Sequence, residues 1–352
     1  MRRKFSRPNR FRQVQRKIRR DRMGRLPINW YGRGEILSKD EWRSAIRRYN
    51  PMEMMDISDK LEQKLRLSEA GVIIPRTYLV IENEDDLARF SDWLDSRDSG
   101  FVIKPSNGHG GSGVLVINKR TASRFIKPSG KGIEKTTLVR HAERIYLGNF
   151  SGNIPDKAII EERLTLSRQL RELMTPGLPD IRVVVFKGFP IMAMTRLPTR
   201  RSGGRANIHQ GALAAGISIS EGRITSATYL RKNVKTHPST GREIIGFRFN
   251  MWDQILEMAS AAADAMEMGF VGVDLTVDQN KGVVVIEVNK RPGLEIQNAN
   301  RKGLKGRMRF VKKEIKRNKM DLKTIGPGIK AELSRQWDIS EWRRVKKGEG
   351  EE

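Results

Sequence analysis

Apolar residues recur along this chain with two spacings, and each spacing predicts a different kind of element. A spacing of three to four residues predicts amphipathic helices, and it occurs at 59–70, 84–94, 138–147 and 252–268. Short, nearly continuous apolar runs predict buried strands, and they occur at 78–81, 101–104, 114–117, 158–161, 181–186, 191–195, 271–277 and 283–288. The order of the two kinds predicts an α+β fold with antiparallel pairs in both halves.

Glycine and asparagine mark the ends of several of these elements. Gly71 is expected just past the end of the first helix, and Gly269 is expected to end the last one. The side chain of Asn83 is expected to cap the helix that follows it. The short segments 187–188 and 278–282 each separate two apolar runs, so each predicts the turn of a β-hairpin.

Charge divides the chain differently from hydrophobicity. Of the formal net charge of +27, residues 1–26 contribute +11, from 12 Lys and Arg against one acid, and residues 301–352 contribute +9, from 17 against 8. The first segment is expected to be a disordered arm. Two interpretations stay open. The basic ends bind a polyanion, such as an acidic protein or a nucleic-acid-containing assembly, or they are solvated surface without a specific partner.

Missing residue types and motifs exclude several kinds of chemistry. The absence of cysteine excludes disulfides, thiolate nucleophiles and Cys-ligated zinc. The chain has neither a P-loop nor the G-x-S-x-G motif of serine hydrolases, and its four histidines lack the spacing of a metal site. No apolar stretch is long enough to span a bilayer, and no signal-peptide core follows Arg2-Arg3. We therefore expect a cytoplasmic protein.

A glycine-rich loop at 108–113 matches the pattern G-x-G-x-x-G. A dinucleotide-binding loop of this pattern continues into a helix, whereas this loop continues into the apolar run 114–117, which predicts a strand. A strand–loop–strand flap can cover phosphates and donate backbone N–H groups to their oxygens. Lys104, on the strand before the loop, could reach the same phosphates. The alternative is a flexible hairpin without a ligand.

Oxygen-bearing side chains lie on the last predicted hairpin. Asp274 is on its first strand, and Glu287 and Asn289 are two residues apart on its second, so these two share a face. If Asp274 lies opposite Glu287, all three converge and form an oxygen site of the kind that Mg²⁺ prefers. The register is open by one residue. The alternative is a solvated strand face.

Basic and amide side chains accompany the middle hairpin and the loop after it. Arg182 and Arg196 lie near opposite ends of that hairpin, followed by Asn207 and His209. Arginines hold the oxygens of an acyl phosphate through paired hydrogen bonds. His209 could position a substrate or relay a proton. The alternatives are ordinary surface charge for the arginines and a structural role for the histidine.

Six short motifs follow one another in the middle of the chain. They are Asp59 to Leu61 with Gly71 to Thr77, Phe101 to Pro105 with the glycine loop, Ile160 to Leu164, Asp180 to Val183, Gly204 to Gly211, and Gly272 to Leu275 with Ile286 to Gly293. In this order they closely resemble the ATP-grasp superfamily, specifically its RimK-type α-L-glutamate ligase branch. The resemblance covers residues 59–303. It implies an ATP-grasp fold, in which two lobes with mostly antiparallel sheets clasp the nucleotide.

The resemblance also implies ATP and Mg²⁺ (or Mn²⁺) as cofactors, and a role for individual residues. Those implied to bind the nucleotide are Lys60 and Lys104 at the phosphates, Gly108, Gly110, Gly111, Ser112 and Gly113 in the flap, Glu161, Glu162 and Leu164 at the hinge that meets adenine, Asp180 at the ribose, and Asn207 at metal or phosphate. Arg182 and Arg196 would face the acyl phosphate and the substrate. Asp274, Glu287 and Asn289 would hold the metal.

The implied organisation has five parts: a basic arm (1–26), a short preamble (27–58), an N-terminal lobe with the flap (59–162), a C-terminal lobe with the metal site (163–300) and a basic extension (301–352). The implied activity is that of an ADP-forming carboxylate–amine ligase, acting on glutamate or an amino-acid-like substrate. One alternative is an enzyme of cell-envelope or sugar-related biosynthesis, because segment 226–250 resembles sugar-transfer-associated ATP-grasp proteins. The other is a polyanion-binding protein with a vestigial ATP-grasp fold.

Overall fold

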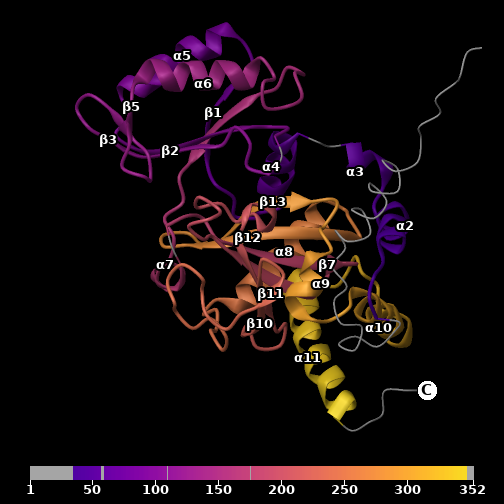
Figure 1. Cartoon of the computed structure of the whole chain (residues 1–352). Helices are drawn as coiled ribbons and strands as arrows, with labels where there is room; N and C mark the ends of the chain where they lie inside the picture. The colour runs from indigo at the N-terminus through magenta and orange to yellow at the C-terminus, as the bar shows by residue number, and fades with distance from the viewer. Residues whose placement is uncertain (1–34, 57–58, 109, 175, 347–352) are drawn as a thin grey trace, which may run out of the picture.

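The computed structural model describes residues 35–56, 59–108, 110–174 and 176–346, which form two lobes, each built on one antiparallel sheet (Figure 1). Helix α4 (Lys60–Glu69) lies between the lobes in this view and contacts β13 and α8 of the larger one. Within the described ranges, no helix combines the length and apolar composition that crossing a membrane requires. The α+β fold with antiparallel pairs in both halves is confirmed.

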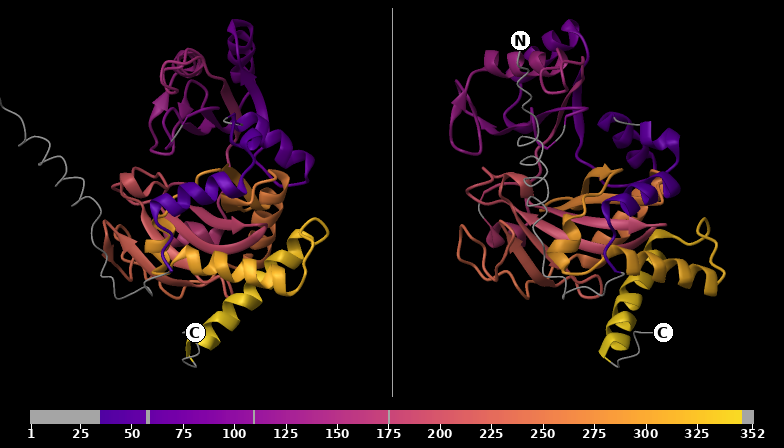
Figure 2. Two further views of the ribbon diagram at one scale, coloured as in Figure 1. Left: turned by 90° about the vertical axis from the view of Figure 1, so that its right-hand side faces the viewer. Right: turned by 45° about the vertical axis from the view of Figure 1, so that its right-hand side comes forward.

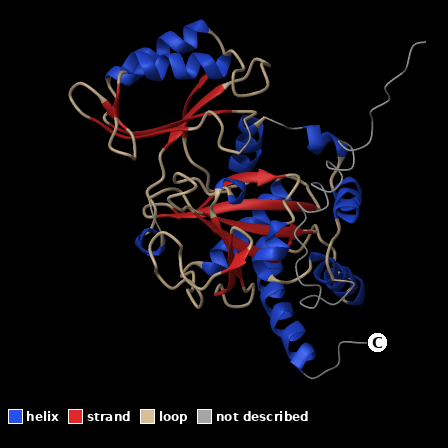
Figure 3. Cartoon of the chain, viewed as in Figure 1, coloured by secondary structure: helices blue, strands red, loops and turns tan. Residues whose placement is uncertain are grey.

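The smaller lobe has a six-stranded sheet in the order β1-β6-β2-β3-β4-β5. Its strands are β1 (Thr77–Ile81), β2 (Ser99–Pro105), β3 (Leu115–Arg120), β4 (Phe125–Ile126), β5 (Gly132–Ile133) and β6 (Ala158–Glu162). Helices α5 (Glu84–Asp95) and α6 (Lys135–Tyr146) lie together over one side of the sheet (Figure 3). Their apolar residues form one core with the strands, which includes Phe90, Phe101 and Leu138.

The larger lobe has a seven-stranded sheet in the order β11-β10-β9-β8-β7-β12-β13. Its strands are β7 (Asp180–Phe186), β8 (Phe189–Leu197), β9 (Leu213–Ile217), β10 (Ile224–Tyr229), β11 (Lys232–Asn233), β12 (Phe270–Asp278) and β13 (Gly282–Asn289). The central strands β7, β8 and β12 are almost wholly buried. This explains their near-continuous apolar runs, because a strand that is covered on both faces does not alternate.

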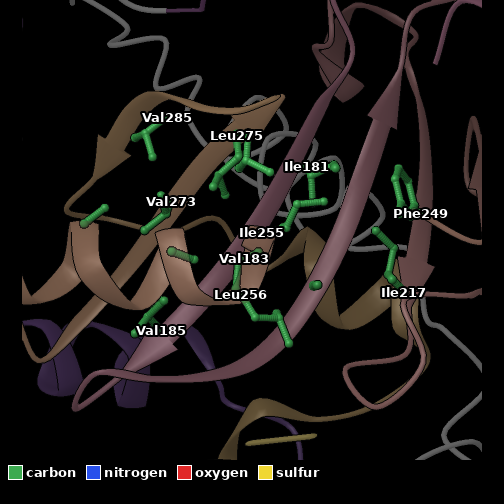
Figure 4. Packing of buried hydrophobic residues seen from close by; sticks show 14 of the residues in the cluster. Ile181, Val183, Val185, Ile217, Phe249, Ile255, Leu256, Val273, Leu275 and Val285 are labelled. Atoms are coloured by element: carbon green, nitrogen blue, oxygen red, sulfur yellow. The ribbon is translucent and has the colours of Figure 1, made fainter. Parts of the chain in front are cut away.

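The two faces of this larger sheet carry different cores. Residues 181, 183 and 185 of β7 point to helix α8 (Trp252–Ala265), and Figure 4 shows their side chains beside Ile255 and Leu256. The short helix α7 (Arg168–Leu173) joins the same core. Residues 184 and 186 point to the opposite face, which is covered by α2 (Lys39–Tyr49), α9 (Glu295–Asn300) and α10 (Leu304–Arg317).

The ends of the elements agree with the sequence in most places. Asn83 caps α5 by accepting a hydrogen bond from the backbone N–H of Asp86, and Gly71 follows α4 with φ of +72°. Gly269 does not end α8 as predicted, because the helix ends at Ala265 and Glu267 takes the left-handed conformation (φ 49°). Gly269 instead permits a close approach, since a Cβ on it would lie 2.6 Å from the carbonyl oxygen of Tyr49.

The segments that flank the two lobes pack on the larger one. Helices α2 and α3 (Met52–Asp56) precede α4, and α10 is followed by α11 (Pro327–Lys346), which packs on α8 and β8. Figure 2 shows α2 lying across the larger sheet. Ion pairs of Lys305 with Glu41 (2.6 Å) and of Arg309 with Glu35 (2.7 Å) join α10 to the start of the described chain. The predicted arm at 1–26 lies outside the described residues.

Candidate active site

One half of a face of the larger sheet is charged, and the other half of the same face is apolar. Asp180 and Arg182 of β7 point to the same side as Val184 and Phe186, because side chains two residues apart share a face. Helices α2, α9 and α10 pack on the apolar half. The switch from apolar to charged residues along β7 therefore places buried charged side chains next to this apolar core.

Strand register brings the charged side chains together. Asp180 lies opposite Arg196, and Arg182 lies opposite Asp274. On the other side of β12, Asp274 lies opposite Glu287. This is the register that the sequence left open and that makes the side chains of the last hairpin converge. Asn289, two residues beyond Glu287, joins the same face.

Hydrogen bonds link these residues into one buried network. Arg182 donates to both carboxylate oxygens of Asp274, at 2.7 and 2.6 Å. Arg196 donates in the same paired manner to Asp180 and adds a bond of 2.9 Å to Asp274. Asn289 donates to Asp274 at 2.9 Å. The planar guanidinium groups suit such paired contacts, so each arginine is fixed in one orientation.

The network holds its two carboxyl groups at different pKa values. Burial raises the pKa of Asp180 to about 6, and the nearby charge of Asp274 adds to this effect while Arg196 opposes it. Burial also acts to raise the pKa of Asp274, but the charges of Arg182 and Arg196 outweigh it and hold that pKa below its usual value. The first proton that this pair accepts therefore goes to Asp180, while Asp274 remains an anion.

Glu287 differs from these two carboxylates, because no hydrogen bond or ion pair joins it to another described side chain. Burial lowers the pKa of the Lys60 ammonium on α4, and the negative charge of Glu287 opposes this effect. No three His, Cys, Asp or Glu side chains gather into a metal site in the described parts of the chain. Asp274, Glu287 and Asn289 present two carboxylates and one amide on one rigid hairpin, and this all-oxygen set fits Mg²⁺, which commonly takes one or two carboxylates.

A buried group of three charges lies in the smaller lobe. Glu161 accepts from Lys64 through one oxygen and from Lys104 through the other, each at 2.7 Å. All three side chains are at most 10% exposed. Lys64 also donates to the carbonyl oxygen of Pro75 at 2.9 Å. Burial acts to raise the pKa of Glu161, but the two lysines outweigh it and lower that pKa.

Sequence reasoning missed Lys64. It lies four residues after Lys60 on α4, so the two ammonium groups share one face of that helix. This spacing is a signal that could have found it. Glu161 was implied to lie at the hinge that meets adenine, and its side chain fixes Lys104.

The glycine loop joins β2 to β3, so the predicted strand–loop–strand arrangement is confirmed. Lys60 donates to the carbonyl oxygens of Ser106 (3.0 Å) and Gly108 (2.7 Å) at the first end of the loop. At the other end, a ring nitrogen of His141 lies 2.8 Å from the carbonyl oxygen of Gly113. The loop is therefore held at both ends.

The tip of the loop reaches the larger lobe. A Cβ placed on Gly110 would lie 3.5 Å from Nδ2 of Asn207, and one on Gly111 would lie 3.8 Å from Cδ of Arg205. Gly110 and Gly111 both have positive φ (64° and 79°), a conformation that side chains disfavour. The exposed Ser112 follows them. The loop thus lies as a flap against segment 204–211.

Several predicted residues lie outside the charged network. His209 is exposed, and only its backbone N–H bonds to the capping oxygen of Asn207 (2.9 Å). Glu162 forms an ion pair with Lys281 (2.5 Å), and Leu164 is half-buried. Asp180, implied to meet the ribose, lies within the network instead, buried and with both oxygens bonded to Arg196.

The chain is similar to one protein family and to several individual proteins. The family model described as sugar-transfer associated ATP-grasp matches residues 42–313. A probable alpha-L-glutamate ligase of Maridesulfovibrio salexigens is 25% identical over 238 residues, which is 67% of this chain and 56% of that protein. Another, of Syntrophotalea carbinolica, is 26% identical over 77% of this chain and 67% of that protein. The solved D-alanine–D-alanine ligase of Bacillus anthracis is 16% identical, with a TM-score of 0.42, over 88% of this chain and 77% of that one.

The first of these relatives is matched over little more than half of its length. The family match is wider on this chain, because it begins within α2 and ends within α10 and so includes both sheets, the flap and the charged network. The resemblance to ATP-grasp proteins is thereby confirmed, and the chain belongs to the sugar-transfer-associated ATP-grasp family.

Proposed function

We propose that this chain is an ATP-dependent ligase that joins a carboxylate to an amine through an acyl phosphate. One observation carries the proposal. An acidic and basic network on one sheet face lies next to an unpaired carboxylate, Glu287, whose charge acts on Lys60 beneath the flap of the opposite lobe. Phosphoryl transfer needs such a set of cations and metal ligands, and it needs no covalent nucleophile.

The proposed nucleotide site lies between the lobes. Lys104 and Lys60 would neutralise phosphate oxygens, and backbone N–H groups of the flap would donate to them. Asp274, Glu287 and Asn289 would hold Mg²⁺, which supplies charge neutralisation at the phosphates when bound. For this, Asp274 would share its oxygens between the metal and the two arginines. Asp180 would keep Arg196 in place.

The proposed reaction has two steps. A carboxylate oxygen of the first substrate attacks the γ-phosphorus of ATP, the bond between that phosphorus and the β–γ bridging oxygen breaks, and ADP leaves. The amine nitrogen of the second substrate then attacks the acyl carbon, the bond to the phosphate oxygen breaks, and phosphate leaves as the nitrogen gives up a proton. Arg182 and Arg196 would hold the acyl phosphate, whose charge lies on oxygens that guanidinium groups bind in pairs.

The substrate pair separates two forms of this proposal. The names of the curated relatives favour glutamate or another amino acid as the substrate. The family description, sugar-transfer associated, favours a carboxylate or amine from cell-envelope or sugar-related biosynthesis. ADP release measured with amino acids, and then with amino sugars and sugar acids, distinguishes the two.

The proposal is tested first by nucleotide binding. The thermal midpoint of unfolding is measured with and without Mg-ATP, for the parent and for Glu287→Gln. Ligand at about 100 times its Kd adds about 2.7 kcal/mol to the free energy of unfolding. The proposal expects a shift in the parent that the variant loses. The absence of a shift in both would refute it and favour the polyanion-binding alternative with a vestigial fold.

A further inference from the structure

Residues 37–56, here called the strap, include α2 and α3 and contact the larger lobe at several points. Asn50 accepts from the backbone N–H of Phe270 (2.8 Å) and donates to its carbonyl oxygen (2.9 Å). The ammonium of Lys290, just after β13, donates to the carbonyl oxygen of Met55 (2.8 Å). The strap is thus fixed both to the start of β12 and to the loop that follows β13.

Trp42 of the strap contacts the loop that follows β13. Its indole N–H donates to the carbonyl oxygen of Pro292 at 2.7 Å. A Cβ placed on Gly272 would be 3.1 Å from Cβ of Pro292 and 3.6 Å from Cδ of Arg182, so both side chains lie next to Gly272. A Cβ on Gly293 would be 3.9 Å from Nη1 of the same arginine. Residues 292–293, here called the wall, therefore lie close to the Arg182 side chain.

We propose that Trp42 is a positioning residue, which acts on the reaction through Pro292 and Arg182. The inference rests on the proposed function, in which Arg182 holds the acyl phosphate. Bonds at the far end of the strap fix its course, and the Trp42 N–H fixes the carbonyl of the wall. Without that bond the wall gains freedom, and the nearby Arg182 guanidinium is positioned less firmly, although its hydrogen bonds to Asp274 remain.

The same lobe provides a matched control on its opposite face. Trp252, the first residue of α8, also donates its indole N–H to a backbone carbonyl, that of Ile219, at 2.7 Å. Its side chain lies in the core between α8 and the sheet. Trp42→Phe and Trp252→Phe therefore delete the same kind of bond and a similar volume. They differ in whether the bond leads to Arg182.

Steady-state ADP release gives the first measurement. A displacement of about 1 Å at a positioning group can cost up to about a hundredfold in rate, and we expect Trp42→Phe to lower kcat by at least tenfold. The KM for ATP should stay within about twofold, since the phosphate-binding lysines are in the other lobe. Trp252→Phe should keep the parent kcat at a temperature where all three proteins are folded. Equal kcat values in the two variants would overturn the inference.

A second measurement is independent of ligase activity. The Nε–H of Arg182 donates to Asp274, so it should give a protected signal in a ¹⁵N-correlated NMR spectrum, assigned with Arg182→Lys. Trp42→Phe should shift or broaden this signal, and Trp252→Phe should leave it unchanged. An unchanged signal in Trp42→Phe would overturn the inference even if the parent were inactive. A parent without ATP-dependent activity but with the expected NMR changes would refute the proposed function alone.

Discussion

The buried charges around Glu161 permit a quantitative prediction about the smaller lobe. Glu161→Gln keeps the shape of the side chain but removes the carboxylate that Lys64 and Lys104 share. One of the two ammonium groups would then face an amide N–H₂ group, which cannot accept its hydrogen bond. We expect this single substitution to be among the most destabilising in the lobe.

The expected magnitude follows from the burial of the three groups. Breaking a buried ion pair from one side costs about 3–5 kcal/mol, because it leaves an uncompensated charge away from water. An exposed pair of the same lobe, Lys135 with Asp95, offers a comparison at 34% and 59% side-chain exposure. Asp95→Asn should cost less than about 1 kcal/mol.

The stability that Glu161→Gln loses should depend on pH in a definite direction. Burial already lowers the pKa of Lys64, and Glu161 opposes this effect. Without the carboxylate, the folded-state pKa of Lys64 falls further below its unfolded value of 10.5. Because the unfolded state then binds more protons, stability rises with pH over that interval. The destabilisation of Glu161→Gln should therefore be smaller at pH 9 than at pH 7.

Equilibrium urea unfolding followed by circular dichroism measures these differences. The set comprises the parent, Glu161→Gln, Lys64→Met, the double variant and Asp95→Asn. The double variant should cost less than the sum of its two single changes by at least about 0.5 kcal/mol, since the groups interact directly. The reasoning is refuted if Glu161→Gln costs no more than Asp95→Asn, or if its cost grows from pH 7 to pH 9.

Three further predictions concern the larger lobe and the amino-terminal segment. Gly272→Ala places a methyl group 3.1 Å from Pro292, so we expect kcat for ADP release to fall while the Mg-ATP thermal shift persists. A folded-state pKa of about 6 for Asp180, against 3.8 in the unfolded chain, gives a contribution to stability that is complete below pH 4 and lost as pH rises through 6. Urea unfolding should therefore show Asp180→Asn gaining stability relative to the parent between pH 4 and pH 7. Deletion of residues 1–26 should weaken binding to a polyanion column, and unchanged salt elution would exclude a role for that segment.

Much of the fold could be predicted because the spacing of apolar residues in the sequence agrees with the positions that are buried in the structure. Strands β7 and β12 are covered on both faces, so their apolar runs are continuous and easy to find. The end of α8 could not be predicted from glycine, because Glu267 takes the positive φ and Gly269 is needed instead for the approach of Tyr49. That approach is a contact between segments more than two hundred residues apart, which local patterns do not contain.

The chemical types of the site were predictable, whereas its pairings were not. Alternation along a strand places Asp180 and Arg182 on one face whatever the neighbours are. The acid that each arginine contacts depends on the register of β7 with β8 and β12. A shift of one residue would move the side chains to the other face and break these pairings. Sequence reasoning treated carboxylates as ligands and arginines as substrate contacts, and so it did not foresee that Arg196 would join Asp180 to Asp274. In the proposed reaction, Arg182 and Arg196 would therefore have two tasks: they would hold the acyl phosphate, and they would fix Asp274, the carboxylate that would hold the metal.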